Sequence, residues 1–403
     1  MAEICYSLKP SIPYLYLDLY MHTYSVSSTA VVNRPNLSTL RFMVRQDDPL
    51  HMPEHSGSML RGAFGVALRS LTCVTDMPEC RDCPLKQHCN FPRIFEMPAL
   101  QHATVQAVNP YVIHVPITDQ MSDHSSDTAD YDHTHHIVQE TQKPKVSGKK
   151  TVTFKKGDIW QFGMTVMGAA VTETTLIVKA WELALASGLG AHSPYRRATL
   201  LQADCDGKTL YTSPQLSPAR AIDLPTSNLQ NFSDLEACNS KEHDLKTSDL
   251  PAYLANQPIQ LTMQFLTPFR YQQNNRIVSH PDNLDSATFI ASLYNRIRLC
   301  QDNHSPDESW DIGYDSYHRF KEDIETLSIA VDIVANHVPR RSNRQQRKMQ
   351  LYGLQGNLHL TGDHQTLSRL LPALQLGERL HIGKNTTMGL GQYRLKLTPP
   401  PLT

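Results

Sequence analysis

The sequence predicts an α+β protein in which the order of elements β-α-β-β-α-β occurs twice. Two observations lead to this prediction. Short runs in which apolar and polar residues alternate are typical of half-buried strands, and longer runs with an apolar residue at every third or fourth position are typical of amphipathic helices. Both halves of the chain contain such runs in the same order. Two tandem units of this kind predict two ferredoxin-like (RRM-like) domains, each an antiparallel sheet with both helices on one face.

The second half shows the pattern most clearly. Ile259, Leu261, Met263 and Phe265 alternate as in a half-buried strand, and a helical pattern begins after Asp285. The later runs are strands at 327–334 and 353–360, a helix at 365–374 with its leucines on one side, and a last strand at 391–397.

The first half supports the same order. Its runs are a strand around 40–44, a helix at 57–71, strands at 111–117 and 158–166, a helix at 172–188 and a strand at 198–204. The first of these helices has an apolar stripe of Leu60, Phe64, Leu68 and Leu71. Gly188 suits a left-handed cap at the end of the second.

Segments of mixed or biased composition divide the chain. We interpret residues 1–37 as an N-terminal extension, 38–212 as the N-terminal ferredoxin-like domain, 213–256 as a linker and 257–403 as the C-terminal ferredoxin-like domain with a glycine-rich loop. Residues 119–150, rich in aspartate and histidine, lie between two strands of the first domain, which favours a flexible, solvated insertion. A histidine-rich metal site is the alternative interpretation of that insertion.

Composition limits the classes of function. The chain has 403 residues, 40% hydrophobic content and a formal net charge of −1, so an argument for an anionic partner must come from local charge. No apolar stretch reaches the roughly 18 residues of a membrane span, and the first residues lack the basic head and apolar core of a signal peptide. We therefore expect a cytoplasmic protein with no membrane partner.

Four of the eight cysteines form a cluster directly after the first predicted helix. Cys73, Cys80, Cys83 and Cys89 offer four soft thiolates, which fits a closed tetrahedral zinc site, a structural knuckle inserted in the first domain. An iron–sulfur cluster would use the same ligands and is the alternative, and four unliganded thiols are the third possibility. A closed site leaves no open position for water, so we expect a structural metal and no catalytic one.

Glycine-rich and basic segments indicate RNA binding. "GLGAHSPYRR" at 188–197 and "GLGQYR" at 389–394 occupy equivalent places in the two units, before each last strand. Glycine lets backbone amides approach phosphate closely, although tight turns also use glycine for steric reasons alone. Arginine binds phosphate and stacks on unpaired bases, and a solvated basic turn is the alternative. The candidate RNA-binding residues are Arg61, Arg196, Arg197, Arg270, Arg340, Arg341, Arg344, Lys384, Gly389 and Gly391.

Several motifs together resemble a known family. They are "GSMLRGAFGVALRSLTC", "CRDCPLKQHCNFPRIFE", "LASGLGAHSPYRRATL", "LTMQFLTPFR", "RRSNRQQRKMQLYGLQG" and "LHIGKNTTMGLGQYRL". In this order, over about residues 40–396, the chain resembles the CRISPR-associated endoribonucleases of the RAMP superfamily that process precursor CRISPR RNA. The resemblance implies tandem ferredoxin-like domains, a glycine-rich loop that holds RNA, and cutting of CRISPR repeat RNA to release mature crRNA.

The resemblance also implies a metal-independent reaction. A ribose 2′-hydroxyl attacks the adjacent phosphate and leaves 2′,3′-cyclic phosphate and 5′-hydroxyl ends, and a histidine at or near the first helix commonly takes part. Here His51 and His55 precede that helix, and His55 is closer to its N-terminus, where backbone amides can also face a phosphate. An exposed loop histidine without a catalytic role is the alternative for each, and His280, His318 or a tyrosine remain further candidates.

Two other classes of function stay open. The chain could be a non-catalytic crRNA-binding subunit of a CRISPR effector complex, in contact with other effector subunits, because the fold and basic segments serve binding without proton transfer. It could also be a zinc-organised protein-interaction module whose arginines meet acidic partners. Binding of repeat RNA without cutting selects the first, and failure to bind RNA favours the second.

Overall fold

The computed structural model describes residues 35–97, 107–116, 151–190, 196–215, 258–342 and 347–398, with only the backbone described for 337–342, 347–350 and Thr398. These residues belong to one compact unit, Asn33–Thr403. Nearly all of the expected N-terminal extension, insertion and linker therefore lies outside the described residues. We call residues 35–215 the N-terminal lobe and residues 258–398 the C-terminal lobe.

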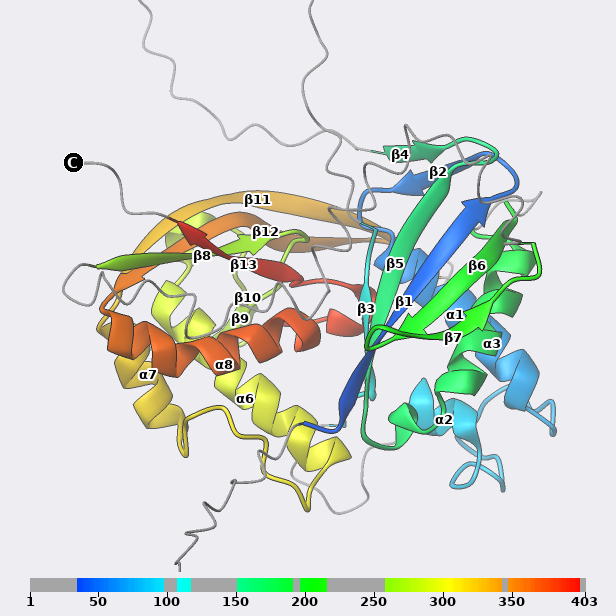
Figure 1. Ribbon diagram of the computed structural model, residues 1–403, viewed down its shortest axis with the longest axis horizontal. Helices are drawn as coiled ribbons and strands as arrows, with labels where there is room; N and C mark the ends of the chain where they lie inside the picture. The colour runs from blue at the N-terminus through cyan, green and yellow to red at the C-terminus, as the bar shows by residue number, and fades with distance from the viewer. Residues whose placement is uncertain are drawn as a thin grey trace, which may run out of the picture. The chain divides into compact units, whose positions relative to one another are not determined.

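The N-terminal lobe has the predicted order of elements. Its six main elements are β1 (Leu37–Gln46), α1 (Gly57–Thr72), β3 (Tyr111–His114), β5 (Ile159–Met167), α3 (Thr174–Ser187) and β6 (Ala198–Cys205). The antiparallel sheet has the strand order β3-β5-β1-β6-β7, where β7 (Lys208–Thr212) is an addition at the edge. The first strand thus lies between the third and the last strands of the unit (Figure 1).

The C-terminal lobe repeats this arrangement. Its main elements are β8 (Ile259–Phe265), α6 (Ser286–His304), β11 (Ser328–Ser342), β12 (Arg347–Gly362), α8 (His364–Leu380) and β13 (Tyr393–Thr398). The strand order β11-β12-β8-β13 again places the first strand between the third and the last. Both lobes therefore confirm the predicted order of elements and the mixed α+β class with antiparallel sheets.

The helix ends follow from local chemistry. Asp285 caps α6, because its Oδ1 accepts a hydrogen bond from the Thr288 N–H at 3.0 Å, and Asp363 caps α8 in the same way through the Thr366 N–H at 2.9 Å. Gly188 ends α3, as predicted, with φ of 99°, which favours glycine, but its ψ of 153° differs from that of the predicted left-handed cap.

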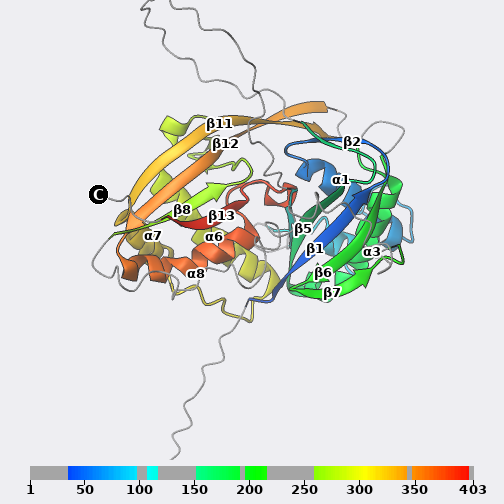
Figure 2. The same cartoon turned by 45° about the horizontal axis from the view of Figure 1, so that its top comes forward.

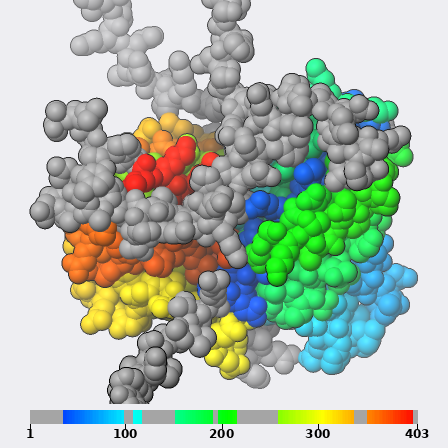
Figure 3. Space-filling model, in the orientation of Figure 1, coloured from blue at the N-terminus to red at the C-terminus, as the bar shows by residue number. Residues whose placement is uncertain are grey.

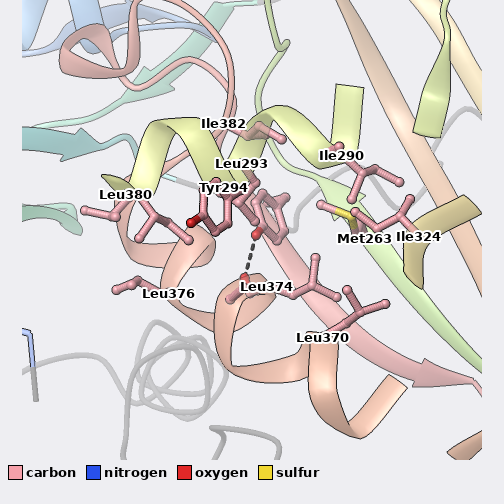
Figure 4. Close-up of a cluster of buried hydrophobic side chains, with 14 of the residues drawn as sticks. Met263, Ile290, Leu293, Tyr294, Ile324, Leu370, Leu374, Leu376, Leu380 and Ile382 are labelled. Atoms are coloured by element: carbon pink, nitrogen blue, oxygen red, sulfur yellow. Dashed lines mark hydrogen bonds between the residues drawn. The ribbon is translucent and has the colours of Figure 1, made fainter. Parts of the chain in front are cut away.

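Each lobe buries its own apolar core. In the N-terminal lobe, Phe42 and Phe64 lie on Trp181, with the Phe64 and Trp181 rings stacked at 5.0 Å. Figure 4 shows the C-terminal core, where Leu293 of α6 and Leu374 of α8 face Met263 of β8. Leu71 differs from its prediction, since its side chain at the end of α1 is 46% exposed and only the other three stripe residues are buried.

Shorter elements without a sequence prediction complete the lobes. In the N-terminal lobe they are β2 (Leu50–Pro53), paired with β4 (Thr151–Phe154), α2 (Asn90–Ile94) and the 3₁₀ turn η1 (Gly168–Val171). In the C-terminal lobe they are β9 (Gln272–Gln273), β10 (Arg276–Ile277), η5 (Pro281–Asn283), α7 (Tyr317–Glu325) and η6 (Thr386–Met388). Among the described residues, no helix is long and apolar enough to cross a membrane.

Candidate active site between the two lobes

The glycine-rich loop of residues 381–392, between α8 and β13, packs directly against the start of α1. A Cβ atom on Gly57, the first residue of α1, would lie 1.9 Å from the carbonyl oxygen of Met388 in η6. A Cβ on Gly389 would lie 2.6 Å from Cγ1 of Val115, the residue after β3's end at His114. Glycine at both positions lets the two lobes meet at backbone distance.

The other glycines of the loop also have close neighbours. Gly383 and Gly391 have φ of 88° and 72°, and an added Cβ would lie 2.5 Å from the Arg270 carbonyl oxygen and 1.9 Å from the Ile382 carbonyl oxygen, respectively. Gly389 and Gly391 are buried, whereas Lys384 is exposed. Packing thus accounts for these glycines, and their contact with RNA stays a prediction.

Two arginines organise the loop from inside the C-terminal lobe. Arg270 donates from Nη1 to Asn385 Oδ1 at 2.6 Å and from Nε to the Tyr352 carbonyl oxygen at 3.0 Å. Arg296 of α6 donates from Nη2 to Thr386 Oγ1 at 2.9 Å and to the Leu380 carbonyl oxygen at 3.3 Å. These contacts place positive charge beneath the loop.

His55 lies at this junction, two residues before α1 begins. Its Nε2 is 3.4 Å from Nδ2 of Asn336 on β11, so a histidine of the N-terminal lobe contacts the C-terminal lobe. Figure 2 shows the β11–β12 hairpin extending toward α1. Burial lowers the pKa of His55 to about 4, since desolvation disfavours the charged imidazolium. At neutral pH the ring is therefore uncharged.

Polar side chains continue from His55 into the C-terminal lobe. Asn336 donates from Nδ2 to Gln355 Oε1 at 2.7 Å, and Gln355 donates from Nε2 to the Leu266 carbonyl oxygen at 3.1 Å. Next to His55, the N-cap residue Ser56 is 1% exposed, and within the described part of the chain neither its Oγ nor His55 Nδ1 has a hydrogen-bond partner. Two buried polar atoms are thus unpaired at the start of α1, where helix amides also favour an anion.

A second pair of histidines lies at the same junction. The rings of His114, at the end of β3, and His381, at the end of α8, meet edge to face with their centroids 4.7 Å apart. Both are buried, and burial lowers the pKa of His114 to about 4 and that of His381 well below its usual value. His114 Nε2 is 2.8 Å from Thr165 Oγ1. Both rings are therefore neutral parts of the contact between the lobes.

The other predicted site residues lie away from His55 or serve further contacts. His51 is exposed on β2, with Nδ1 at 2.9 Å from Thr153 Oγ1 of the paired strand β4. Arg61 donates from Nε to the Tyr111 hydroxyl at 3.0 Å, and its guanidinium lies 4.4 Å from the Phe95 ring centroid. Arg197 pairs with Asp48, whose pKa is lowered chiefly by the Arg197 backbone N–H.

The roles of several other candidate residues stay predictions because of their positions in the structure. Arg196 forms a bridge with Leu189, so the first glycine-rich segment closes on itself beside β6. Arg340 and Arg341 lie on β11 with only their backbone described, and Arg344 lies outside the described residues. His280 and His318 are exposed, and each has a carboxylate partner at 3.2 Å, Asp282 and Glu322 respectively.

The four clustered cysteines line one cavity of about 330 Å³ beside the end of α1. All four are free thiols, and the Thr75 hydroxyl lies 3.9 Å from Cys73 Sγ and 3.5 Å from Cys83 Sγ. The Thr75 backbone N–H lowers the pKa of Cys73, whereas burial raises that of Cys80. In the described part of the chain, no group of three or more His, Cys, Asp or Glu side chains is placed to hold a metal ion. Figure 3 shows this segment at the surface, in light blue.

Sequence reasoning missed the partners of His55. Asn336 and Gln355 are uncharged residues within strands, and nothing in their local sequence distinguishes them from polar residues on a solvated sheet face. Their roles depend on pairing between β11 and β12 and on the contact between lobes, neither of which local periodicity reports. The "HSG" sequence at 55–57, a histidine before a helix that begins with glycine, was the available signal.

Two family models match this chain, one in each lobe. Residues 263–393 match the family model of the CRISPR-associated endoribonuclease Cas6. For the C-terminal lobe, this match confirms the resemblance that the motifs predicted. A second family model, described as an N-terminal domain, matches residues 35–221. Among curated proteins, none matches this chain.

The solved structures that resemble this chain are distant from it in sequence. A partial Cas6-RT-Cas1–Cas2 complex is 14% identical with a TM-score of 0.45, and the match covers 91% of this chain and 47% of the other, so this chain spans about half the length of that protein. Thermus thermophilus Cas6 is 11% identical with a TM-score of 0.42, over 89% and 98% of the two chains. A Cas6-related protein from Pyrococcus furiosus is 8% identical with a TM-score of 0.40, over 90% and 99%.

Proposed function

We propose that this chain is an endoribonuclease that binds the repeats of precursor CRISPR RNA and cleaves them without a catalytic metal. In the proposed reaction the ribose 2′-oxygen attacks the adjacent phosphorus, the bond to the 5′-oxygen breaks, and the products carry 2′,3′-cyclic phosphate and 5′-hydroxyl ends. The observation that supports this most is His55, a neutral imidazole at the start of α1 beside the glycine-rich loop. The match of residues 263–393 to the Cas6 family model supports the substrate class.

The groups around His55 are suited to binding a phosphate. The α1 N-terminus offers backbone amides and the favourable end of the helix dipole, and Arg270 and Arg296 lie beneath the loop that packs on it. Exposed Lys384 adds charge on the outer side of the loop. An unpaired RNA strand passing this junction would meet both lobes.

The test is cleavage of the cognate repeat RNA in excess chelator by the unmutated protein and by His55→Ala and His51→Ala. A histidine that acts on the reacting groups contributes about 10²- to 10⁴-fold, so we expect His55→Ala to lose that much rate while RNA binding persists. Loss with His51→Ala alone would move the role to His51. Cleavage that stops in chelator and returns with Mg²⁺ would contradict metal independence.

A non-catalytic crRNA-binding role is the second candidate, because the loop and its arginines serve binding without proton transfer. Tight binding of repeat RNA with no cutting by the unmutated protein would select it. The structural neighbour described as a Cas6-RT-Cas1–Cas2 complex motivates a further proposal, that this chain contacts other CRISPR proteins. Co-purification of the tagged chain with the CRISPR proteins of its own host tests this.

We also propose that Cys73, Cys80, Cys83 and Cys89 hold a structural Zn²⁺, with an iron–sulfur cluster as the alternative. Four free thiols around one cavity are a donor set suited to zinc, although among the described residues the four sulfur atoms do not surround a common point. Zinc would require the segment to close, and it would supply fold stability and no catalytic step.

Metal analysis of the purified protein tests the proposed zinc site. We expect about one zinc per chain, lost in Cys80→Ser and Cys83→Ser and retained in the control Cys205→Ser, whose thiol lies on β6. Iron with visible absorbance would select the cluster. Metal-free protein with the same melting temperature in chelator would contradict both.

A further inference from the structure

A backbone carbonyl fixes the direction of the polar chain that ends at His55. The Leu266 carbonyl oxygen can only accept, so the side chain of Gln355 must turn its Nε2 toward it, at 3.1 Å. Gln355 Oε1 then faces Asn336, which must turn its Nδ2 toward that oxygen, at 2.7 Å. Each amide is thus oriented by the group beyond it, and no reversed orientation satisfies both contacts.

The orientation of Asn336 determines the tautomer of His55. Asn336 Nδ2 carries two N–H groups, one used by Gln355, and the other is available to His55 Nε2 at 3.4 Å. Because an amide nitrogen only donates, Nε2 must accept and carries no proton. A neutral imidazole with an unprotonated Nε2 has its proton on Nδ1, which is the buried atom without a partner among the described residues.

We propose that Asn336, oriented by Gln355 and the Leu266 carbonyl, holds His55 with its proton on Nδ1, so that His55 meets the RNA as a hydrogen-bond donor to a phosphate oxygen and not as the base that removes the 2′-hydroxyl proton. This inference rests on the proposed function for its substrate. The ligand class is a phosphodiester. Asn336 and Gln355 are positioning residues, since they act through His55.

The physical reason lies in what each nitrogen can do. Nε2 accepts a hydrogen bond from an amide N–H, which makes it a poorer base. The buried N–H of Nδ1 has no partner, which is unfavourable until a hydrogen-bond acceptor binds. Negative charge grows on the phosphate oxygens as the 2′-oxygen attacks, so a donor aimed at them binds the transition state more strongly than the ground state. The Oγ of Ser56, the next residue along the chain, is likewise buried without a partner among the described residues.

In the proposed step, His55 neither takes up nor gives up a proton. The bond from the 2′-oxygen to phosphorus forms and the bond from phosphorus to the 5′-oxygen breaks. The 2′-hydroxyl proton leaves to water or hydroxide, and the 5′-oxygen takes a proton from water. His55 keeps its Nδ1 proton throughout, and the reaction needs no further reactant.

The decisive experiment reads the tautomer directly in RNA-free, full-length protein labelled with ¹⁵N-histidine. Ring nitrogen shifts at neutral pH distinguish a protonated from an unprotonated nitrogen, and the His55 signals are those absent from His55→Ala. We expect a protonated Nδ1 in the unmutated protein. In Asn336→Asp the carboxylate only accepts, so Nε2 becomes protonated. A protonated Nε2 in the unmutated protein overturns the proposal, and this reading does not depend on whether the protein cuts RNA.

Kinetics test the role of the donor. Asn336→Leu should lower the cleavage rate on the order of 10-fold with little change in RNA affinity, as loss of a group that orients a reacting side chain does. The matched control is Asn357→Leu, an asparagine on β12 that donates to Asp332 and not to the chain of amides. Equal rates for Asn336→Leu and the unmutated enzyme would overturn the positioning role. If Asn336→Leu does not fold, the tautomer measured in the unmutated protein still tests the proposal.

The pH profile separates donor from base. With His55 as a donor, the rate of the unmutated enzyme rises with pH as hydroxide takes the 2′ proton, with no His55 titration between about pH 5.5 and 8. An inflection in that range that disappears in His55→Ala overturns the proposal. A protonated Nδ1 in a protein that cuts no repeat RNA would keep the tautomer, and would remove both the donor role and the proposed function.

Discussion

At the scale of single residues, the structure gives Arg270 a second role beside the predicted one. From the sequence, it is a candidate RNA-binding residue. In the folded chain its guanidinium joins the glycine-rich loop at Asn385 to β12 at the Tyr352 carbonyl. These contacts need the planar fork of arginine, because one group must donate in two directions.

We therefore expect Arg270→Lys to destabilise the protein even though it keeps the charge. Loss of one or both hydrogen bonds of a charged, half-buried group should lower the free energy of unfolding by about 1–2 kcal/mol. Urea unfolding measures this, with Arg276→Lys on the exposed start of β10 as the control, expected within about 0.5 kcal/mol of the unmutated protein. Equal stability of the two variants would show that Arg270 does not hold the loop.

At the scale of elements, the sequence predicted the main helices and strands because periodicity is a local property. The apolar stripes of α1 and α8 indicated which face of each helix is buried. Asp285 marked the start of α6, and Gly188 marked the end of α3. It did not predict β2, β4 or α7, which are short and have no sustained period. It also could not show that α1 begins against Met388, because that contact joins residues from opposite ends of the chain.

Substitutions of two glycines of α1 test the contact with Met388, because we expect opposite effects on stability. Gly57→Ala places a Cβ 1.9 Å from the Met388 carbonyl oxygen, so backbone must move, and we expect a loss of about 1–3 kcal/mol in stability together with slower RNA cleavage, since His55 is two residues away. Gly62→Ala meets no atom within 4 Å and should stabilise the helix by about 0.5–1 kcal/mol. Unfolding curves and cleavage rates of both variants measure this, and equal effects would contradict the assigned contact.

At the scale of the whole molecule, the sequence predicted the architecture of each lobe but not how the candidate site is assembled. His55 was a candidate from its place before a helix, whereas its partners Asn336 and Gln355 emerged only when the two lobes met. The same holds for His114 and His381, which the sequence did not mark and which form a neutral pair at the junction. Such contacts depend on the packing of lobes, and local patterns carry no information on them.

This neutral pair predicts acid sensitivity in a defined range of pH. Burial, together with the nearby charge of Arg379, lowers the pKa of His114 from 6.5 to about 4, so the unfolded chain binds its proton first as the pH falls. Stability is thus fully present above about pH 6.5 and is lost toward pH 4, by about 3 kcal/mol for a fully buried ring. The pKa of Asp363 is lowered from 3.8, chiefly by its hydrogen bond from the Thr366 backbone N–H, so this carboxylate titrates below that range.

The measurement is the free energy of unfolding between pH 4.5 and pH 7 for the unmutated protein, for His114→Gln and for a matched control. His114→Gln lowers stability at pH 7 by losing ring contacts, but it removes one titrating group, so its curve should be flatter than that of the unmutated protein. His318→Gln, with a side chain 84% exposed on α7, should leave the slope unchanged. Parallel curves for all three proteins would mean that His114 keeps an ordinary pKa, and that the contact between the lobes tolerates its charge.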